Sequence, residues 1–167
     1  MHQRIVLRVN GEQLPVVIRN AEPGDEALIF NGWLESYRQS DFAKVLGNHV
    51  YYTHHHKTIT ELLARPSVVV RCIVQEDTNW QVLGWMCAEP ASRVVHYAAT
   101  KKTWREMGVA RALLASFAIE HGWPADSEIE FTHRTFYVDK AMQRSPHYQR
   151  RLRFNPYRFY TPTKAAA

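Results

Sequence analysis

The 167-residue chain is 46% hydrophobic and 22% charged, and it carries a net charge of +5. This composition excludes a disordered or fibrous protein, and the length fits one domain with one core. No apolar run approaches the roughly 18 residues that span a bilayer, and the N-terminal residues lack the apolar block of a secretory signal. We therefore expect a single domain over residues 1–167, with a core at about 16–133, a cytoplasmic location and no membrane association.

The first patterns along the chain predict a β-hairpin and then a helix. Residues 4–9 and 14–19 resemble strands, and between them Asn10-Gly11 is a strong signal for a hairpin turn. We expect an N-terminal hairpin, or one strand preceded by an appended arm. A helix then opens at residues 23–25, Pro-Gly-Asp, and its apolar side chains, spaced four residues apart from Ile29, should face the core.

A second helix and two strands are expected next. The helix begins near Thr53, a plausible N-cap, and ends before Pro66, because proline lacks the amide that would continue it. Residues 67–74 are nearly continuous in β-branched residues, as in a central strand covered on both faces. After a polar turn at 75–79, residues 82–89 form its antiparallel partner. Cysteines inside such strands are expected to be reduced core residues, and these are Cys72 and Cys87.

The last regular elements are a strand, a helix and a strand. The strand runs from Arg93 to about Thr100, and at Gly108 the apolar period changes from two to 3.6, which predicts a helix. Gly122 followed by proline is the expected stop. Residues 128–133 alternate as a final strand, and an irregular aromatic and basic tail, which includes Lys164, follows it.

The segment most informative about chemistry is the passage from the strand at 93–100 through a basic loop into the following helix. Gly108 and Ala110 in the first helical turn are small enough to let a ligand approach the backbone. Unpaired amides at a helix start carry partial positive charge and suit a diphosphate. Lys101 and Lys102 could also reach phosphates, although a solvated basic loop is an equally good interpretation.

The pattern Arg105-x-x-Gly108-x-Ala110 resembles the signature of the GNAT family of N-acetyltransferases, and the order of elements over residues 16–133 is similar to that family as well. The resemblance implies an α/β (α+β) fold whose mixed, mostly antiparallel sheet is flanked by helices and splayed at the strand before the long helix. It also implies acetyl-CoA as acyl donor and an amine as acceptor. The residues expected at coenzyme A are Ala98, Ala99, Thr100, Arg105, Glu106, Met107, Gly108, Val109, Ala110 and Arg111. The alternative is a helix start that only packs against a strand.

Three short segments, at residues 32–38, 132–135 and 154–157, resemble segments of GNAT-like proteins of tailed bacteriophages. That resemblance implies either an enzyme or a non-catalytic virion component on the same scaffold. It also implies other phage proteins as partners, and a location in the host cytoplasm or the virion.

In the GNAT family the acceptor amine attacks the thioester directly, so a base and an acid are required. Tyr148 is the candidate acid because 148–154 is similar to the family's tyrosine, basic stretch and Gly-Phe. Three departures are that Arg153 stands where glycine is usual, that the spacing is one residue longer, and that Pro146 interrupts the preceding helix. Glu89, at a strand end, and His96, on the strand expected to carry the thioester, are the candidate bases. Alternatively, Glu89 is a solvated strand end, and His96 is a core histidine whose ring nitrogens are hydrogen-bonded.

Two further features have non-catalytic interpretations. His54-His55-His56 is expected to lie on the N-terminal face of the second helix, where side chains about 100° apart cannot converge on one metal ion, and we predict no metal. The tail arginines and aromatic residues at 148–160 resemble a nucleic-acid surface, which would suit a nucleic-acid-modifying relative. We prefer a C-terminal strand whose arginines shield the edge of the sheet.

Overall fold

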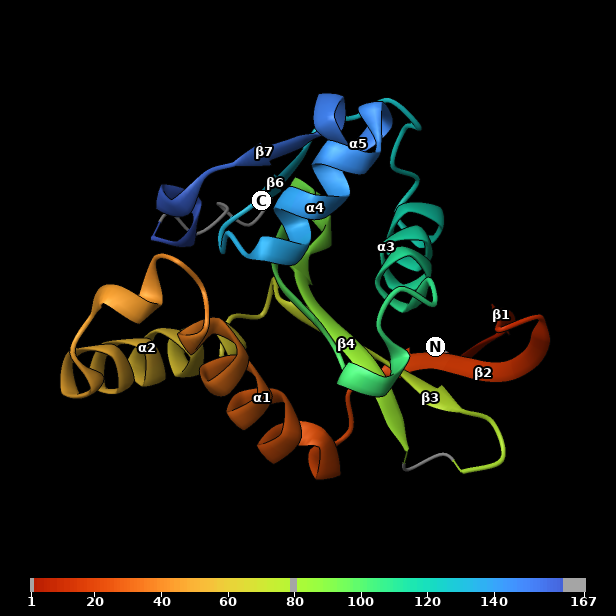
Figure 1. The fold of residues 1–167 in the computed structure, drawn as a ribbon, viewed down its shortest axis with the longest axis horizontal. Coiled ribbons are helices and arrows are strands. Elements are labelled where there is room, and N and C mark those ends of the chain that lie inside the picture. Colours follow the sequence, from red (N-terminus) through yellow and green to blue (C-terminus); the bar gives the residue numbers. More distant parts are fainter. Residues whose placement is uncertain (1, 79–80, 161–167) are drawn as a thin grey trace.

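The computed structural model describes residues 2–78 and 81–160, and a seven-stranded sheet runs through them with its strands in chain order (Figure 1). The strands are β1 (His2–Val9), β2 (Glu12–Asn20), β3 (Val69–Gln75), β4 (Val82–Glu89), β5 (Val94–Thr100), β6 (Ile129–Phe131) and β7 (Leu152–Phe154). Neighbours from β1 to β5 are antiparallel, whereas β5, β6 and β7 are parallel. Two residues named above, Asn79 and Lys164, lie outside the described part of the chain.

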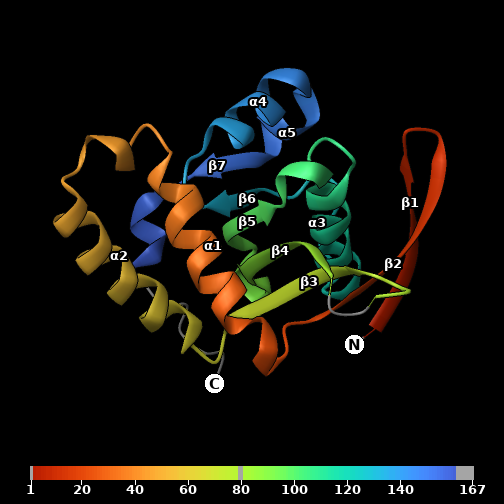
Figure 2. The same cartoon turned by 60° about the horizontal axis from the view of Figure 1, so that its bottom comes forward.

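Helices cover both faces of the sheet. The helices are α1 (Glu26–Arg38), α2 (Asn48–Leu63), α3 (Val109–Glu120), α4 (Phe136–Arg144) and α5 (Pro146–Arg151). Figure 2 shows α1 and α2 on one side of the central strands and α3 on the other, while α4 and α5 connect β6 to β7. The expected fold class, a mixed and mostly antiparallel sheet flanked by helices, is confirmed. Among the described residues, no helix is both long and apolar enough to cross a membrane.

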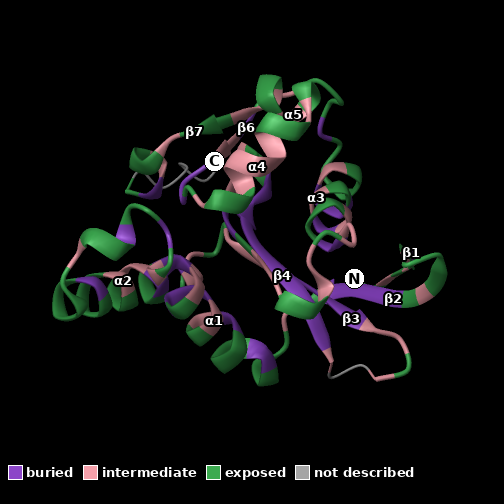
Figure 3. Cartoon of the chain, viewed as in Figure 1, coloured by how far each residue is buried: buried purple, intermediate pink, exposed green. Residues whose placement is uncertain are grey.

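Two apolar cores lie on the two faces, and the central strands are buried between them (Figure 3). The core under α1 and α2 is rich in aromatic side chains, including Trp33, Tyr37 and Tyr97. The core under α3 is mostly aliphatic, with Leu113 at its centre. Both cysteines are buried and reduced, as predicted.

The expected hairpin is confirmed, and the expected start of α2 is wrong. Asn10 and Gly11 both adopt left-handed backbone angles, with φ of 52° and 88°, which is the geometry of a tight hairpin turn. The second helix begins at Asn48, not near Thr53. Packing explains the earlier start, because Tyr51 is buried against α1. Its hydroxyl donates to the carbonyl oxygen of Leu34 on that helix, at 2.7 Å.

The tail is more regular than expected. After the short strand β6, the chain forms α4, α5, β7 and a 3-10 turn at Pro156–Phe159. Each of these elements is nine residues or shorter. Helix α4 is amphipathic, but its length is below the window of about 11 residues in which an apolar period is read from a sequence. The preferred interpretation of the tail as an edge strand is confirmed, since β7 pairs with β6 at the end of the sheet.

Candidate functional site

One edge of β5 is open along most of its length. The parallel strand β6 pairs with Val94 and Val95, and the last backbone bond between the two segments joins the Thr132 amide to the Val95 carbonyl at 3.2 Å. Beyond that point β5 continues beside β4 alone, as far as the pair Gly84–Thr100. The predicted splay is therefore confirmed. It leaves the backbone edge at Ala98–Thr100 without a neighbouring strand, and the Thr100 carbonyl there accepts from Arg105 Nε at 3.4 Å.

The helix that follows begins close to this open edge. Gly108 caps α3 with φ of 81°, a left-handed conformation that glycine adopts without strain. The first-turn amides of α3 have no partner inside the helix. Gly84 of β4 brings these parts together, because a Cβ there would lie 2.7 Å from both the Ala99 carbonyl oxygen and Val109 Cγ1. The absence of a side chain at Gly84 thus lets the β5 backbone and the Val109 side chain of α3 pack directly against β4.

Helix α4 contacts the loop before α3. The Arg105 guanidinium donates to the Tyr137 hydroxyl at 2.6 Å and lies over its ring, 4.8 Å from the centroid. Glu106 forms an ion pair with Lys140, which lowers the pKa of the glutamate. The sequence offered no signal for these contacts, because the α4 residues lie more than 30 positions further along the chain.

The residues expected at coenzyme A are distributed around this junction. Ala98, Ala110 and Arg111 are exposed, and Ala99 and Thr100 are partly buried. Val109 is 1% exposed and packs in the α3 core, so only its backbone amide could meet a ligand.

Glu89 and His96, the two candidate bases, lie together but below the surface. Tyr97 and Val95 pair with consecutive residues of β4, so His96 is the extra residue of a β-bulge. Its Nε2 lies 3.2 Å from Glu89 Oε1, which also pairs with Arg65 at 3.2 Å. Burial lowers the pKa of His96. Glu89 is 3% exposed and His96 1%, so the interpretation of Glu89 as a solvated strand end is wrong. Glu89 is paired with Arg65 and His96, and both ring nitrogens of His96 have partners, so neither side chain offers a group to an amine.

The candidate acid, Tyr148, lies on α5. Its ring packs edge-on against His147, with centroids 5.6 Å apart. The expected interruption by proline is confirmed, since α4 ends before Ser145 and α5 starts at Pro146.

Sequence reasoning missed an aromatic cluster between α1, α2 and the point where β5 and β6 separate. The cluster consists of Trp33, Tyr37, His55, Tyr97, His133 and Phe159. The His133 ring centroid lies 4.7 Å from that of Tyr37 and 5.2 Å from those of Trp33 and His55. These residues come from five separate segments of the chain, and no local pattern connects them.

The three consecutive histidines lie in the middle of α2, not on its N-terminal face as expected. Their rings diverge: His55 stacks between Tyr37 and Tyr51, whereas His56 packs edge-on against Phe30. Burial lowers the pKa of His55 to about 4. Within the described residues, no group of three histidine, cysteine, aspartate or glutamate side chains is arranged to hold a metal ion.

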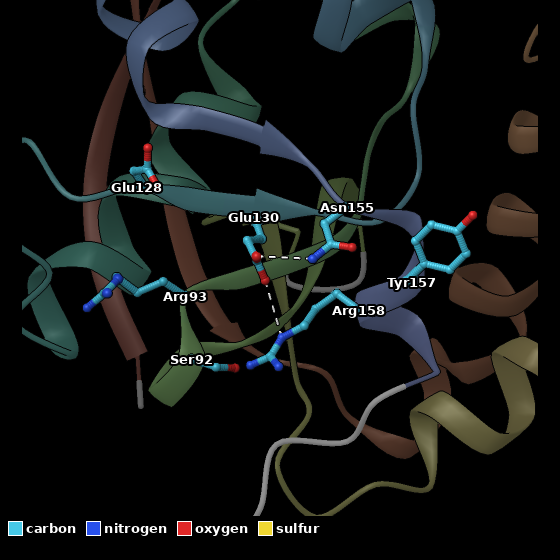
Figure 4. A pocket seen from close by; sticks show the side chains of 7 residues that line it. All are labelled: Ser92, Arg93, Glu128, Glu130, Asn155, Tyr157 and Arg158. Atoms are coloured by element: carbon cyan, nitrogen blue, oxygen red, sulfur yellow. Dashed lines mark hydrogen bonds and ion pairs between the residues drawn. The ribbon is translucent and has the colours of Figure 1, made fainter.

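A hollow of about 420 Å³ lies at the other end of β5, away from the loop (Figure 4). It is lined by Ser92, Arg93, Glu128, Glu130, Asn155, Tyr157 and Arg158. Glu130 accepts from Asn155 at 3.1 Å and pairs with Arg158 at 3.2 Å, so its carboxylate holds the 3-10 turn against β6. We assign this hollow a structural role.

Comparisons with known proteins give distant likenesses of fold. No protein-family model and no curated protein matches the sequence. Among solved structures, the chain is similar to a protein described as an acetyltransferase of the GNAT family from Desulfovibrio desulfuricans, at 18% identity and a TM-score of 0.41. That match covers 64% of this chain and 66% of the other, so the chain spans slightly less than two thirds of that protein's length.

The chain is also similar to an aminoglycoside acetyltransferase from an uncultured soil metagenomic sample, solved in complex with sisomicin and with trehalose. The identities are 12% and 14% and the TM-scores 0.47 and 0.44. These matches cover 80% and 77% of this chain and 87% and 83% of the other.

Proposed function

We propose that this protein is an acyl-CoA-dependent N-acyltransferase that uses acetyl-CoA and transfers the acyl group to an amine. The observation that carries the proposal is the open edge of β5 leading directly to the glycine-capped start of α3. An extended pantetheine arm can add to an unpaired strand edge as another strand would. A diphosphate is stabilised at the end of that edge by the amides of a helix start.

The charges around the loop are compatible with an anionic ligand. Glu106 is the acidic residue of the loop, and its ion pairs with Lys140 and, at 3.9 Å, with Arg144 offset its negative charge. Lys101 and Lys102 are exposed beside it. A diphosphate arriving at Gly108 would therefore meet a net positive surface.

In this proposal the chemistry is direct transfer. The amine attacks the thioester carbon held along Ala98–Thr100, and Tyr148 protonates the departing sulfur. Glu89 and His96 are engaged with each other and with Arg65 and Thr132, so they would act through a third group.

Calorimetry with acetyl-CoA and a pair of glycine variants tests the proposal. Gly108→Glu adds bulk and negative charge at the diphosphate position and should weaken acetyl-CoA binding at least tenfold. Gly122→Glu is the matched control, because Gly122 also has a positive φ, 60°, but caps the opposite end of α3. Equal affinities of the two variants would show that the ligand binds elsewhere. A wild-type protein that does not bind millimolar acetyl-CoA would overturn the proposal.

One observation favours a non-catalytic role as the second candidate. The Arg105 side chain, expected at coenzyme A, is engaged by Tyr137. In a phage structural or interaction module with this fold, the contact with Tyr137 would hold Arg105 and its loop against α4. The Tyr137→Phe variant separates the two candidates: an enzyme that needs Arg105 should bind acetyl-CoA at least as tightly, whereas a structural module should bind none in either form.

A nucleic-acid function is not favoured by the tail. Arg153 pairs with Glu128 at 2.9 Å, Arg158 pairs with Glu130, and Arg151 donates to the Ser127 carbonyl. Arginines engaged within the protein have fewer donors for phosphates. No binding to duplex DNA at low salt is the expected result.

A further inference from the structure

Five polar side chains form a continuous buried chain that starts at the candidate bases and ends in the aromatic cluster. Arg65 pairs with Glu89, and Glu89 Oε1 lies 3.2 Å from His96 Nε2. His96 Nδ1 lies 3.2 Å from Thr132 Oγ1, which lies 2.9 Å from His133 Nδ1. From Glu89 to His133 every member is 7% exposed or less, so the chain is shielded from bulk water.

Donors and acceptors along this chain can be assigned in one direction. The Glu89 carboxylate only accepts, so His96 Nε2 carries a proton and donates to it, and Nδ1 of neutral His96 holds a lone pair. The Thr132 hydroxyl lies 3.2 Å from Nδ1 and 3.3 Å from the His96 carbonyl oxygen, both of them acceptors, so it donates to one of the two and accepts from His133. The His96 carbonyl, 3.0 Å from His133 Nδ1, also only accepts. His133 therefore carries its proton on Nδ1, and its Nε2 keeps a lone pair.

His133 lies where β5 and β6 separate. His133 is the second residue after the end of β6, and its Nδ1 is hydrogen-bonded to the His96 carbonyl. His96 precedes Ala98 on β5 by two residues, a distance of roughly 7 Å along the strand. No described residue forms a hydrogen bond with its Nε2. Trp33 Nε1 and His55 Nε2, in the same aromatic cluster, are buried without a partner as well. Buried polar atoms nearly always have partners, so these two nitrogens beside the His133 ring point to a place for a polar ligand group.

We propose that His133 is the catalytic base that accepts the acceptor amine's proton at Nε2, and that Glu89, His96 and Thr132 are positioning residues that hold its tautomer. This inference rests on the proposed transferase function. The lone pair of the neutral amine forms the new C–N bond, the C–S bond breaks with its electron pair going to sulfur, and the amine proton passes to Nε2. The sulfur takes a proton from Tyr148, and both side chains then exchange protons with water.

Electrostatics determine the protonation state of His133. Burial, together with His55 and His96, holds the pKa of His133 well below its usual range, so the ring is neutral at pH 7 and its Nε2 lone pair is not protonated. The low pKa also makes the ring a weak base, so the proposal requires that the hydrogen bonds from Nδ1 to the His96 carbonyl and Thr132 support the imidazolium that forms transiently.

The first test requires no acceptor. Long-range ¹H–¹⁵N spectra of the histidine rings at pH 7.5, with His133 assigned by the peaks missing from His133→Gln, should show Nδ1 protonated and Nε2 bare. Thr132→Val, which keeps the side-chain shape but removes the hydroxyl, should shift the His133 ring resonances while the His96 carbonyl still holds the proton on Nδ1. A proton on Nε2 in the wild-type protein would overturn the inference.

The second test separates this inference from the function on which it rests. Saturating acetyl-CoA should shift the His133 ring resonances but not those of the exposed His147 on α5. If calorimetry shows binding while the His133 resonances stay unchanged, the base is elsewhere although the transferase proposal stands. If acetyl-CoA does not bind, both proposals fall.

The third test is kinetic. The assay measures thiol release from acetyl-CoA with a panel of primary amines. His133→Gln should lower kcat about 10²–10⁴-fold, which is the usual contribution of a general base. The Kd for acetyl-CoA should be unchanged. His54→Gln, an exposed substitution on α2, should keep the wild-type rate. Equal rates for the two variants would exclude His133 as the base.

Discussion

The side chains that α3 covers differ in kind from those that α1 and α2 cover. Under α3, Leu113, Ile73 and Ile129 pack as an aliphatic layer, and its buried charge, Arg71, is paired with Glu120 at the rim. Under α1 and α2, histidines and tyrosines are buried among tryptophan and phenylalanine, and the chain from Glu89 to His133 runs beneath them. The α3 face is suited to stability, whereas the other face buries groups that can exchange protons.

The largest expected effect tests the aliphatic face. Leu113→Ala removes a fully buried side chain and should lower the free energy of unfolding by about 2–5 kcal/mol. Urea denaturation at pH 7 and pH 5 should give the same loss, because no proton exchange is involved. Ile119→Ala, at a position 72% exposed on the same helix, should change stability by less than about 0.5 kcal/mol. A loss that depends on pH would contradict the comparison.

The next effect tests the titratable face. The pKa of His55 is lowered to about 4 in the folded protein from 6.5. Between these values the unfolded chain binds a proton that the folded protein does not, so the free energy of unfolding falls as pH drops from about 6.5 to 4. This group contributes roughly 3 kcal/mol at most. His55→Phe should flatten denaturation midpoints measured across this range, and an unchanged slope would show that His55 is accessible to solvent.

The smallest effect compares a buried carboxylate with an exposed one. Glu89→Gln removes the charge that Arg65 and His96 share, and it should cost about 1.5–3 kcal/mol. Glu128→Gln disrupts the exposed pair with Arg153 and should cost at most about 1 kcal/mol. Thermal or urea denaturation measures both. Equal losses of stability would show that the buried interactions of Glu89 contribute no more than the exposed ion pair of Glu128.

Sequence reasoning was accurate where structure depends on neighbouring residues. The hairpin at Asn10-Gly11, the limits of β4, and the glycine at the start of α3 follow from backbone preferences and short apolar periods. Such patterns also predicted that Ala98–Thr100 and Gly108 would lie close together, because a single loop joins them. Prediction was weaker for α2 and the tail, where packing determines the ends of elements and their short lengths hide any period.

By itself, the sequence determined the order of the strands and helices as far as β6 and the loop from β5 into α3, because these rest on interactions within a few residues. Only the tertiary structure decided that Glu89 and His96 are joined to His133, and that Arg105 meets Tyr137. Those contacts link residues 7 to 37 positions apart. They form when the β5 bulge and the separation of β5 from β6 bring distant side chains together, which no local pattern of residues encodes.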